Sequence, residues 1–115
     1  MKLVVAVIQP PKLSALREAL VKVGVERMTV CDAAGYGQQR GRTPMYRGNE
    51  YATQLLRKIA LEIVVNDDFL DRTIETIERV ARTGPSGEIG DGKIFILPVD
   101  EAIEIGRPIR GPEAV

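Results

Sequence analysis

The sequence predicts an α+β fold whose elements follow the order β-α-β-β-α-β, with an antiparallel sheet and both helices on one face. Short apolar runs typical of strands alternate with two longer stretches in which apolar residues recur at helical spacing. One helical stretch falls between the first two runs and the other between the last two. The chain has 115 residues, of which 44% are hydrophobic, so it can bury one modest core. We therefore expect a single domain over residues 1–115.

The first strand and the first helix come at the start of the chain. Residues 3–8 form a continuous, valine-rich run, as in a buried strand, and two prolines end it. From Lys12 onward, polar residues separate apolar ones at helical spacing: Leu13, Leu16, Leu20 and Val23. Pro11 suits the first turn of this helix, and Gly24 is well placed to end it.

Two further strands and a second helix follow. The strands are predicted over about 28–33 and over 59–65, where apolar residues alternate. Asp67 or Asp68 can accept hydrogen bonds from the free N–H groups of the second helix's first turn. This helix has an apolar stripe made of Leu70, Ile74, Ile77 and Ala81. The fourth strand is predicted over 94–97.

This order is the split βαβ arrangement of a ferredoxin-like fold. The helices then cover one face of the sheet and leave the other face open. Because the strands are rich in apolar residues, exposing that face is costly, and we expect self-association. The C-terminal tail, 106–115, contains several glycines and prolines and is predicted to be a mobile or partner-dependent extension.

The charge balance restricts the possible partners. Sixteen basic and sixteen acidic residues cancel, so no global field draws the protein to nucleic acid or to an anionic membrane. Cys31, the one cysteine, suits a reducing compartment and is interpreted as a buried structural thiol. The apolar run at the N-terminus is too short for a signal peptide or a bilayer span. The sequence thus predicts a soluble cytoplasmic protein without membrane insertion.

A glycine-rich turn over residues 87–93 has the most distinctive chemistry. Glycines let backbone N–H groups turn toward an anion, and Lys93 supplies a positive charge for a phosphate. The spacing approaches a Walker A motif, but Ile94 replaces the hydroxyl residue that would bind magnesium. The turn also follows a helix and opens a strand, the reverse of a P-loop. On these residues alone, a phosphate cradle and a tight connection with an exposed lysine are equally supported.

Residues 35–56 lack useful periodicity and are predicted to form a long loop. Compact domains seldom keep such a loop without a use. Its arginines and amides can bind oxyanions, and its tyrosines can anchor a partner surface, so we interpret it as a recognition loop. An ordinary flexible connection between two strands is the alternative.

Three segments in this order closely resemble the PII signal-transduction proteins: GYGQQRG at 35–41, YRGNEY at 46–51, and Thr83-Gly84 followed by GDGKIF at 90–95. The resemblance covers nearly all of the chain up to about residue 105, apart from an apparent three-residue insertion at 85–87. It implies a homotrimeric sensor of nitrogen, carbon and energy status. Each cleft between subunits would bind a nucleotide, and the long loop, through residues 37–55, would contact a target transporter or enzyme.

The resemblance also implies roles for individual residues. The nucleotide-binding positions are Thr29, Gly35, Gly37, Gln38, Glu62, Val64, Gly90, Asp91, Gly92 and Lys93. The last four belong to a phosphate-binding loop, 83–93, with Lys93 as its cation, and Thr29 matches a position that contacts adenine. The effector-binding positions are Gln39, Arg40, Gly41 and Lys58. Gln39 would ligate a Mg²⁺ shared by ATP and 2-oxoglutarate, and Lys58 would pair with an effector carboxylate. Tyr51, near the loop tip, matches the tyrosine that some bacterial members uridylylate.

Several departures from the family pattern change the charge around these ligands. Gln9 replaces a lysine that helps to hold 2-oxoglutarate, and Gln38 replaces an arginine that approaches the phosphates. Glu104 and Gly106, on a predicted final strand, replace two arginines that the family presents from the neighbouring subunit. Arg107 and Arg110 could restore this charge. Each lost charge-assisted contact costs about 1.5–3 kcal/mol, which is enough to erase a preference for ATP over ADP or AMP.

Four functions therefore remain under comparison. The first is a PII-type regulator that binds ATP or ADP, with Mg²⁺ and 2-oxoglutarate as further ligands. The second is a divergent PII-like sensor of ADP, AMP or another anion that is not coupled to 2-oxoglutarate. A small phosphatase is the third. Without histidine the chain offers few general bases or nucleophiles, so we expect that the protein is not an enzyme. A plain structural trimer is the fourth, and it leaves the two loop motifs without a role.

Overall fold

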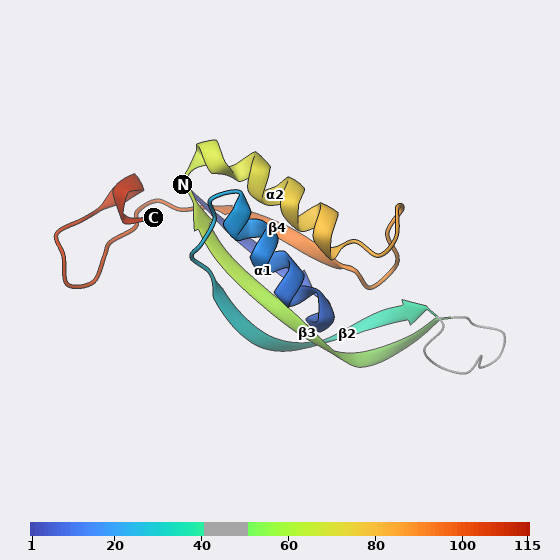
Figure 1. Ribbon diagram of the computed structural model, residues 1–115. Helices are drawn as coiled ribbons and strands as arrows, with labels where there is room; N and C mark the ends of the chain where they lie inside the picture. The colour runs from blue at the N-terminus through green and yellow to red at the C-terminus, as the bar shows by residue number, and fades with distance from the viewer. Residues whose placement is uncertain (41–50) are drawn as a thin grey trace.

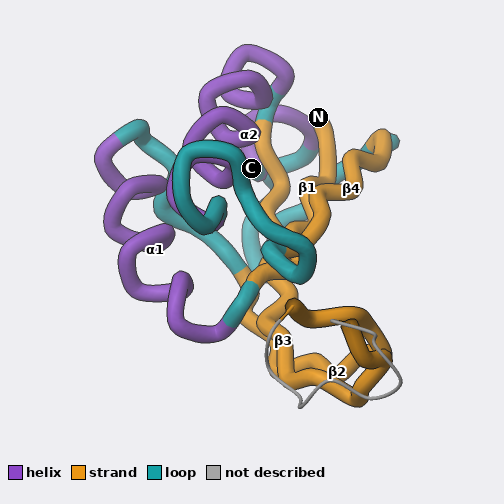
Figure 2. Tube along the Cα trace, turned by 90° about the vertical axis from the view of Figure 1, so that its right-hand side faces the viewer, coloured by secondary structure: helices purple, strands orange, loops and turns teal. Residues whose placement is uncertain are grey.

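The computed structural model describes the backbone of residues 1–40 and 51–115 and the side chains of residues 1–37 and 55–115. These residues form a four-stranded antiparallel sheet in the order β2-β3-β1-β4, with both helices on one face (Figures 1 and 2). The predicted α+β, ferredoxin-like fold is therefore confirmed. The elements are β1 Lys2–Ile8, α1 Leu13–Lys22, β2 Thr29–Arg40, β3 Tyr51–Val65, α2 Asp67–Ala81 and β4 Gly92–Pro98, with short 3-10 helices at Pro10–Lys12 and Gly111–Ala114.

Helix α1 is entered through prolines and ended by a glycine. Pro11 lies in the 3-10 turn Pro10–Lys12 that precedes α1, one turn earlier than predicted. Gly24 has a φ of +89°, and its N–H donates to the carbonyl of Val21 while the N–H of Val25 donates to that of Leu20. This pair of hydrogen bonds is a Schellman motif, so the predicted end of the helix is confirmed.

Helix α2 begins and packs differently from the prediction. Its N-cap residue is Asn66, and Asp67 and Asp68 lie inside the first turn. The buried face includes Thr73 and Thr76, which the predicted stripe of Leu70, Ile74, Ile77 and Ala81 had omitted. Both threonine hydroxyls donate to the backbone carbonyl four residues earlier, at 2.7 Å. These hydrogen bonds satisfy the hydroxyls, so the threonines can be buried among apolar side chains.

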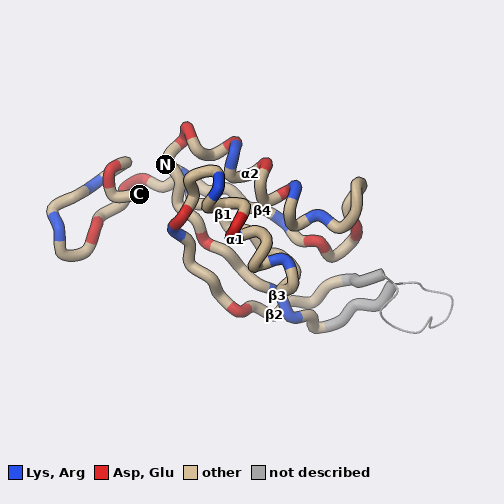
Figure 3. The backbone as a smooth tube through the Cα atoms, in the orientation of Figure 1, with Lys and Arg blue, Asp and Glu red and all other residues tan. Residues whose placement is uncertain are grey.

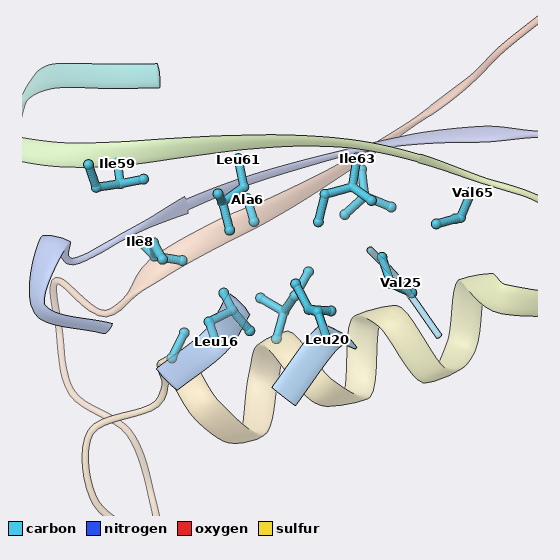
Figure 4. Close-up of a cluster of buried hydrophobic side chains, with 12 residues drawn as sticks. Ala6, Ile8, Leu16, Leu20, Val25, Ile59, Leu61, Ile63 and Val65 are labelled. Carbon is cyan, nitrogen blue, oxygen red and sulfur yellow. The ribbon is translucent and has the colours of Figure 1, made fainter. Parts of the chain in front are cut away.

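The core lies between the sheet and the helices (Figure 4). Alternate residues of β1 and β3 point toward the helices, as the period of two in a strand requires. The buried apolar cluster consists of Val4, Ala6, Ile8, Leu16, Leu20, Val25, Ile59, Leu61, Ile63, Val65, Ile77 and Ala81. Leu61 and Ile63 are completely buried at its centre.

Strands β2 and β3 continue past the end of β1 as a two-stranded ribbon (Figure 1). We call residues 33–40 and 51–58 the β2–β3 ribbon. It runs from the pair Ala33–Lys58 to the pair Arg40–Tyr51. The predicted loop over 35–56 is therefore paired strand at both ends, because backbone hydrogen bonding does not need the apolar periodicity by which we recognised strands. Residues 41–50 lie outside the described residues.

The face of the sheet opposite the helices is open and apolar, as predicted. Phe95 and Leu97 of β4 point to this face beside Val5 and Leu3 of β1 and are 51% and 44% exposed. Ile96, on the other face of β4, is still 45% exposed. Strand β4 is also an edge strand of the sheet. It therefore has apolar side chains and an unpaired edge available to a partner.

The C-terminal segment folds into a hairpin, although the sequence predicted a mobile or partner-dependent extension. Ile103 and Arg110 form an isolated antiparallel bridge, and the N–H of Gly111 donates to the carbonyl of Ala102 at 2.8 Å. Asn66 Nδ2 donates to the carbonyl of Pro112, which attaches the segment to the start of α2. The hairpin and the β2–β3 ribbon lie at opposite ends of the molecule (Figure 1).

Residues of both charge signs are interspersed along the helices and the hairpin (Figure 3). This distribution agrees with the net charge of zero. In the described parts of the chain, no helix has the length and hydropathy that crossing a membrane requires.

Candidate functional site

A cavity of about 500 Å³ opens at the base of the β2–β3 ribbon, next to the start of β4. The end of β1, both ribbon strands, the loop before β4 and β4 itself contribute to its wall. The lining residues are Val7, Gly35, Tyr36, Gly37, Leu56, Lys58, Ile89, Gly90, Gly92, Lys93 and Phe95. We call it the ribbon cavity.

The ribbon cavity brings together predicted residues from distant parts of the sequence. Five predicted nucleotide positions line it, and so does Lys58, a predicted effector position; the five are Gly35, Gly37, Gly90, Gly92 and Lys93. Lys58 and Lys93 are the charged members, and no acidic residue occurs among the described residues of the wall. Two ammonium groups on the wall of one cavity favour an anionic ligand.

The remaining wall of the cavity is apolar or aromatic, and the sequence analysis assigned it no role. It is formed by Val7, Tyr36, Leu56, Ile89 and Phe95. Part of this apolar wall could have been predicted from the pairing of β1 with β4. Val7 pairs with Lys93 and Val5 pairs with Phe95, so alternate residues of β4 share the open face with β1. Apolar walls with a few convergent polar groups are typical of small-molecule sites.

Three other predicted nucleotide positions lie farther along the open face and do not line the cavity. Thr29 of β2 and Glu62 of β3 are directly paired across the two strands. Cys31 Sγ lies 3.8 Å from Glu62 Oε1 on the same face, and Cys31 is only partly buried, not the fully buried thiol that the sequence predicted. Val64, two residues beyond Glu62, is also exposed. Eight of the ten predicted nucleotide positions therefore form two separate groups within one chain.

The loop between α2 and β4 forms the floor beside Lys93. It leaves a helix and opens a strand, as predicted, and its glycines at 84, 87, 90 and 92 all have positive φ. This conformation favours glycine, because a Cβ atom would be strained there. Gly92 is the tightest position, since an added Cβ would lie 1.8 Å from the carbonyl oxygen of Val7.

Asp91 organises this loop from inside. Its Oδ1 accepts from the Thr83 hydroxyl at 2.6 Å, and its Oδ2 accepts from the N–H groups of Thr83 and Glu88 at 2.9 and 2.8 Å. The N–H of Asp91 itself donates to the carbonyl of Glu88. The carboxylate therefore joins the two ends of the loop, a role that the sequence did not reveal.

The hydrogen bonds to Asp91 lower its pKa. Burial alone raises the pKa of this carboxyl, but the donors from Thr83 and Glu88, with the nearby charge of Lys12, outweigh it. The unfolded chain then binds more protons than the native chain in acid, so this contribution to stability rises with pH. It is fully present above the ordinary carboxyl pKa and is lost as the pH falls through the lowered native value.

Asp91→Asn should destabilise the protein by about 1–3 kcal/mol at neutral pH. The NH₂ group of asparagine cannot accept a hydrogen bond, so at least one donor that binds a carboxylate oxygen in the native protein loses its acceptor. The free energy of unfolding of both proteins can be measured by denaturant titration between about pH 7 and about pH 2. The difference should shrink toward the acid end. A difference that stays constant with pH would show that the charge of Asp91 has no part in it.

The outer side of the loop is held at the carbonyl of Gly90. Lys58 Nζ donates to this oxygen at 2.7 Å, and Gln9 Nε2 donates to it at 3.1 Å. Lys58 comes from β3 and Gln9 from the residue after β1. The loop beside Lys93 is thus attached to two strands of the sheet.

The residues of the apparent insertion, 85–87, lie on another side of this loop. Ser86 and Gly87 line a second cavity of about 540 Å³ with Ile77 of α2 and with Arg82, the residue after α2. An added Cβ on Gly87 would lie 3.2 Å from Asp91 Oδ2. The inserted segment is therefore packed against the residue that organises the loop.

Two of the departures from the family charge pattern, Glu104 and Gly106, lie in the C-terminal hairpin. Glu104 lies there and not on a strand of the sheet, and its carboxylate accepts two hydrogen bonds from Arg107, at 2.6 and 2.9 Å. Arg110 pairs with Glu101 at 3.1 Å. Both arginines that could supply charge to the ligand thus have carboxylate partners within the hairpin.

The other predicted residues lie on the ribbon or beyond it. Gln38, Gln39 and Arg40 are the last residues of β2, and Tyr51 is the first residue of β3, paired with Arg40. The side chains of these four residues, and Gly41 altogether, lie outside the described part of the structure. In the parts that are described, no cluster of three histidine, cysteine or acidic side chains could hold a metal ion.

Comparison with known proteins gives concordant matches. The family model described as "Nitrogen regulatory protein P-II" matches residues 1–108. The nitrogen regulatory protein GlnK1 of Methanosarcina mazei is 47% identical over 115 residues, all of this chain and 97% of the relative. A nitrogen regulatory protein P-II of Azospirillum brasilense is 44% identical over 115 residues, the full length of both. The solved structure of B. subtilis GlnK aligns with a TM-score of 0.79 and 34% identity, covering 99% of this chain and 97% of that one.

Proposed function

The chain belongs to the P-II family of nitrogen regulatory proteins, and from this premise we propose that it senses an adenine nucleotide, ATP or ADP, in the ribbon cavity. Proteins of this family are regulatory signal transducers that interact with target proteins. The observation that carries the proposal is the wall of the cavity, where Lys58 and Lys93 lie beside a glycine-built loop. Such a wall suits the phosphates of a nucleotide.

The phosphates would lie against Gly90, Gly92 and Lys93, with Gly35 and Gly37 of the ribbon on the other side. Asp91 would act mainly by shaping this loop, because its carboxylate is bound to Thr83 and Glu88. Gln38 would complete the phosphate contacts from the ribbon.

Thr29, Glu62 and Val64 would bind the adenine from an adjoining subunit. They lie on the same open face as Lys93 but do not line its cavity. If a second copy of the chain completes the nucleotide site, these three residues need not lie next to the ribbon cavity of their own chain.

A homotrimer is the assembly that we propose. The open face and strand β4 support it, because Phe95, Ile96 and Leu97 are each about half exposed and β4 is an edge strand. Covering these side chains in a symmetric assembly would remove apolar area from water and protect the edge.

The effector site would adjoin the nucleotide. Lys58 would pair with a carboxylate of 2-oxoglutarate, and Gln39, with Arg40 and Gly41, would hold the effector and a Mg²⁺ ion shared with ATP. A second candidate is a sensor of ADP, AMP or another anion that 2-oxoglutarate does not affect. The neutral side chain of Gln9 favours this candidate, since its amide is bound to Gly90 and adds no positive charge.

Signal output would occur through residues 37–55, which would contact a transporter or a metabolic enzyme in the cytoplasm. Tyr51 would be the position for covalent modification. The protein would act by changing the population of loop states, without catalysing a reaction and without binding nucleic acid. Such switching requires that a ligand binds one loop state more tightly than the other.

Calorimetric titration of the purified protein with ATP, ADP and AMP tests the proposal, each with and without Mg²⁺ and 2-oxoglutarate. We expect at least one adenine nucleotide to bind. A nucleotide affinity that 2-oxoglutarate changes supports the first candidate, and an unchanged affinity supports the second. If no adenine nucleotide binds, the proposed function is wrong.

A further inference from the structure

The carbonyl oxygen of Gly90 accepts hydrogen bonds from two side chains of different charge. The neutral amide of Gln9 donates at 3.1 Å, and the ammonium group of Lys58 donates at 2.7 Å. Both hydrogen bonds are partly buried, and they join residues 81 and 32 positions apart in the sequence. They therefore connect the loop before β4 to the sheet.

Gly90 needs such an attachment because of its position in the loop. Its φ of +97° lies in a region that glycine populates easily, and it lies between Gly87 and Gly92, whose φ values are also positive. Asp91 holds the loop from inside through Thr83 and Glu88. Gln9 and Lys58 hold it from outside, on the side of the ribbon cavity.

The two outer donors differ in what an anion does to them. Lys58 lines the ribbon cavity, whereas Gln9 is not among the described residues of its wall. A carboxylate or phosphate attracts an ammonium group more strongly than a neutral carbonyl does. An anion in the cavity thus competes with Gly90 for Lys58, and it leaves the hydrogen bond from Gln9 in place.

We infer that Gln9 is a positioning residue that keeps Gly90, and with it the phosphate-facing loop, in place whether or not Lys58 remains bound to that carbonyl. The role in ligand binding rests on the proposed function, but the attachment itself is independent of it. Gln9 and Lys58 then support each other, so removing either donor alone loosens the loop less than removing both.

Hydrogen exchange of the free protein tests the attachment. In Gln9→Met, which keeps the length of the side chain and removes the donor, the amides of Glu88 and Asp91 should exchange about 2- to 10-fold faster. Gln9→Lys retains a donor and should restore protection. The double variant of Gln9→Met and Lys58→Met should exceed the product of the two single effects, while the amides of β1 and β3 remain unchanged.

Titration with ADP separates this inference from the proposed function. Gln9→Met should weaken ADP binding by a factor similar to the loss of protection, because binding must then order the loop. Unchanged protection in Gln9→Met, or equal loosening by Gln9→Lys, would overturn the inference even if ADP binds. Altered protection in a protein that binds none of the adenine nucleotides would support the positioning role and contradict the proposed function.

Discussion

Gly92→Ala is expected to destabilise the protein by at least about 3 kcal/mol, enough to unfold a marginally stable domain. Two costs combine at this position. The φ of +128° is strained for any residue with a side chain, and the new Cβ would lie 1.8 Å from the carbonyl oxygen of Val7. Since Gly92 begins β4, relief requires that β4 move away from β1. Thermal or denaturant unfolding of the purified variant measures the effect.

Gly84→Ala is the matched control for the conformational cost alone. Gly84 has a φ of +66°, but an added Cβ would meet nothing within 4 Å. This variant should lose only about 1–2 kcal/mol. If the two variants were equally stable, the close approach of Gly92 to β1 would not be a determinant of the fold.

Lys93→Gln is expected to weaken nucleotide binding about 10- to 100-fold while leaving the stability of the free protein nearly unchanged. Lys93 is exposed on the open face, and it is one of two positive charges among the described residues of the ribbon cavity. Its removal therefore takes away one of these two charges. The loss should be larger at low ionic strength, because salt screens an exposed charge. Calorimetry with ATP and ADP at two salt concentrations measures it.

Lys22→Gln provides the control for net charge. Lys22 is an exposed residue at the end of α1 and does not line the ribbon cavity. The same change of charge there should leave the affinity within about twofold. If both variants bound equally well, the phosphates would lie elsewhere on the protein, and the role proposed for Lys93 would be wrong.

Local patterns were sufficient to predict most of the fold. Apolar periodicity identified both helices and all four strands, because a buried face repeats with the period of its element. The prediction of a loop over 35–56 was wrong at both ends, because residues 35–40 and 51–56 pair through their backbones and need no apolar repeat. Thr73 and Thr76 were omitted from the core because their hydrogen bonds to α2 carbonyls cannot be recognised from residue type.

The candidate site was only partly accessible to sequence reasoning. The glycines and Lys93 were identified from their spacing, and the family resemblance added Lys58 and Gly35 from distant segments. The ribbon cavity brings Gly35, Lys58, Gly90, Gly92 and Lys93 together. The hairpin that pairs Glu104 with Arg107 could not be foreseen, because a glycine- and proline-rich tail has no periodicity from which to predict it.

The sequence by itself determined the order of the elements, the family and the glycine-built loop that ends in Lys93, because helical spacing, strand alternation and the need for positive φ are properties of neighbouring residues. Only the tertiary structure decided that Gln9 and Lys58 meet at the carbonyl of Gly90 and that Asp91 holds Thr83 and Glu88. The contacts at Gly90 join residues far apart in the chain, and they exist because the sheet places the end of β1 beside β3 and the start of β4.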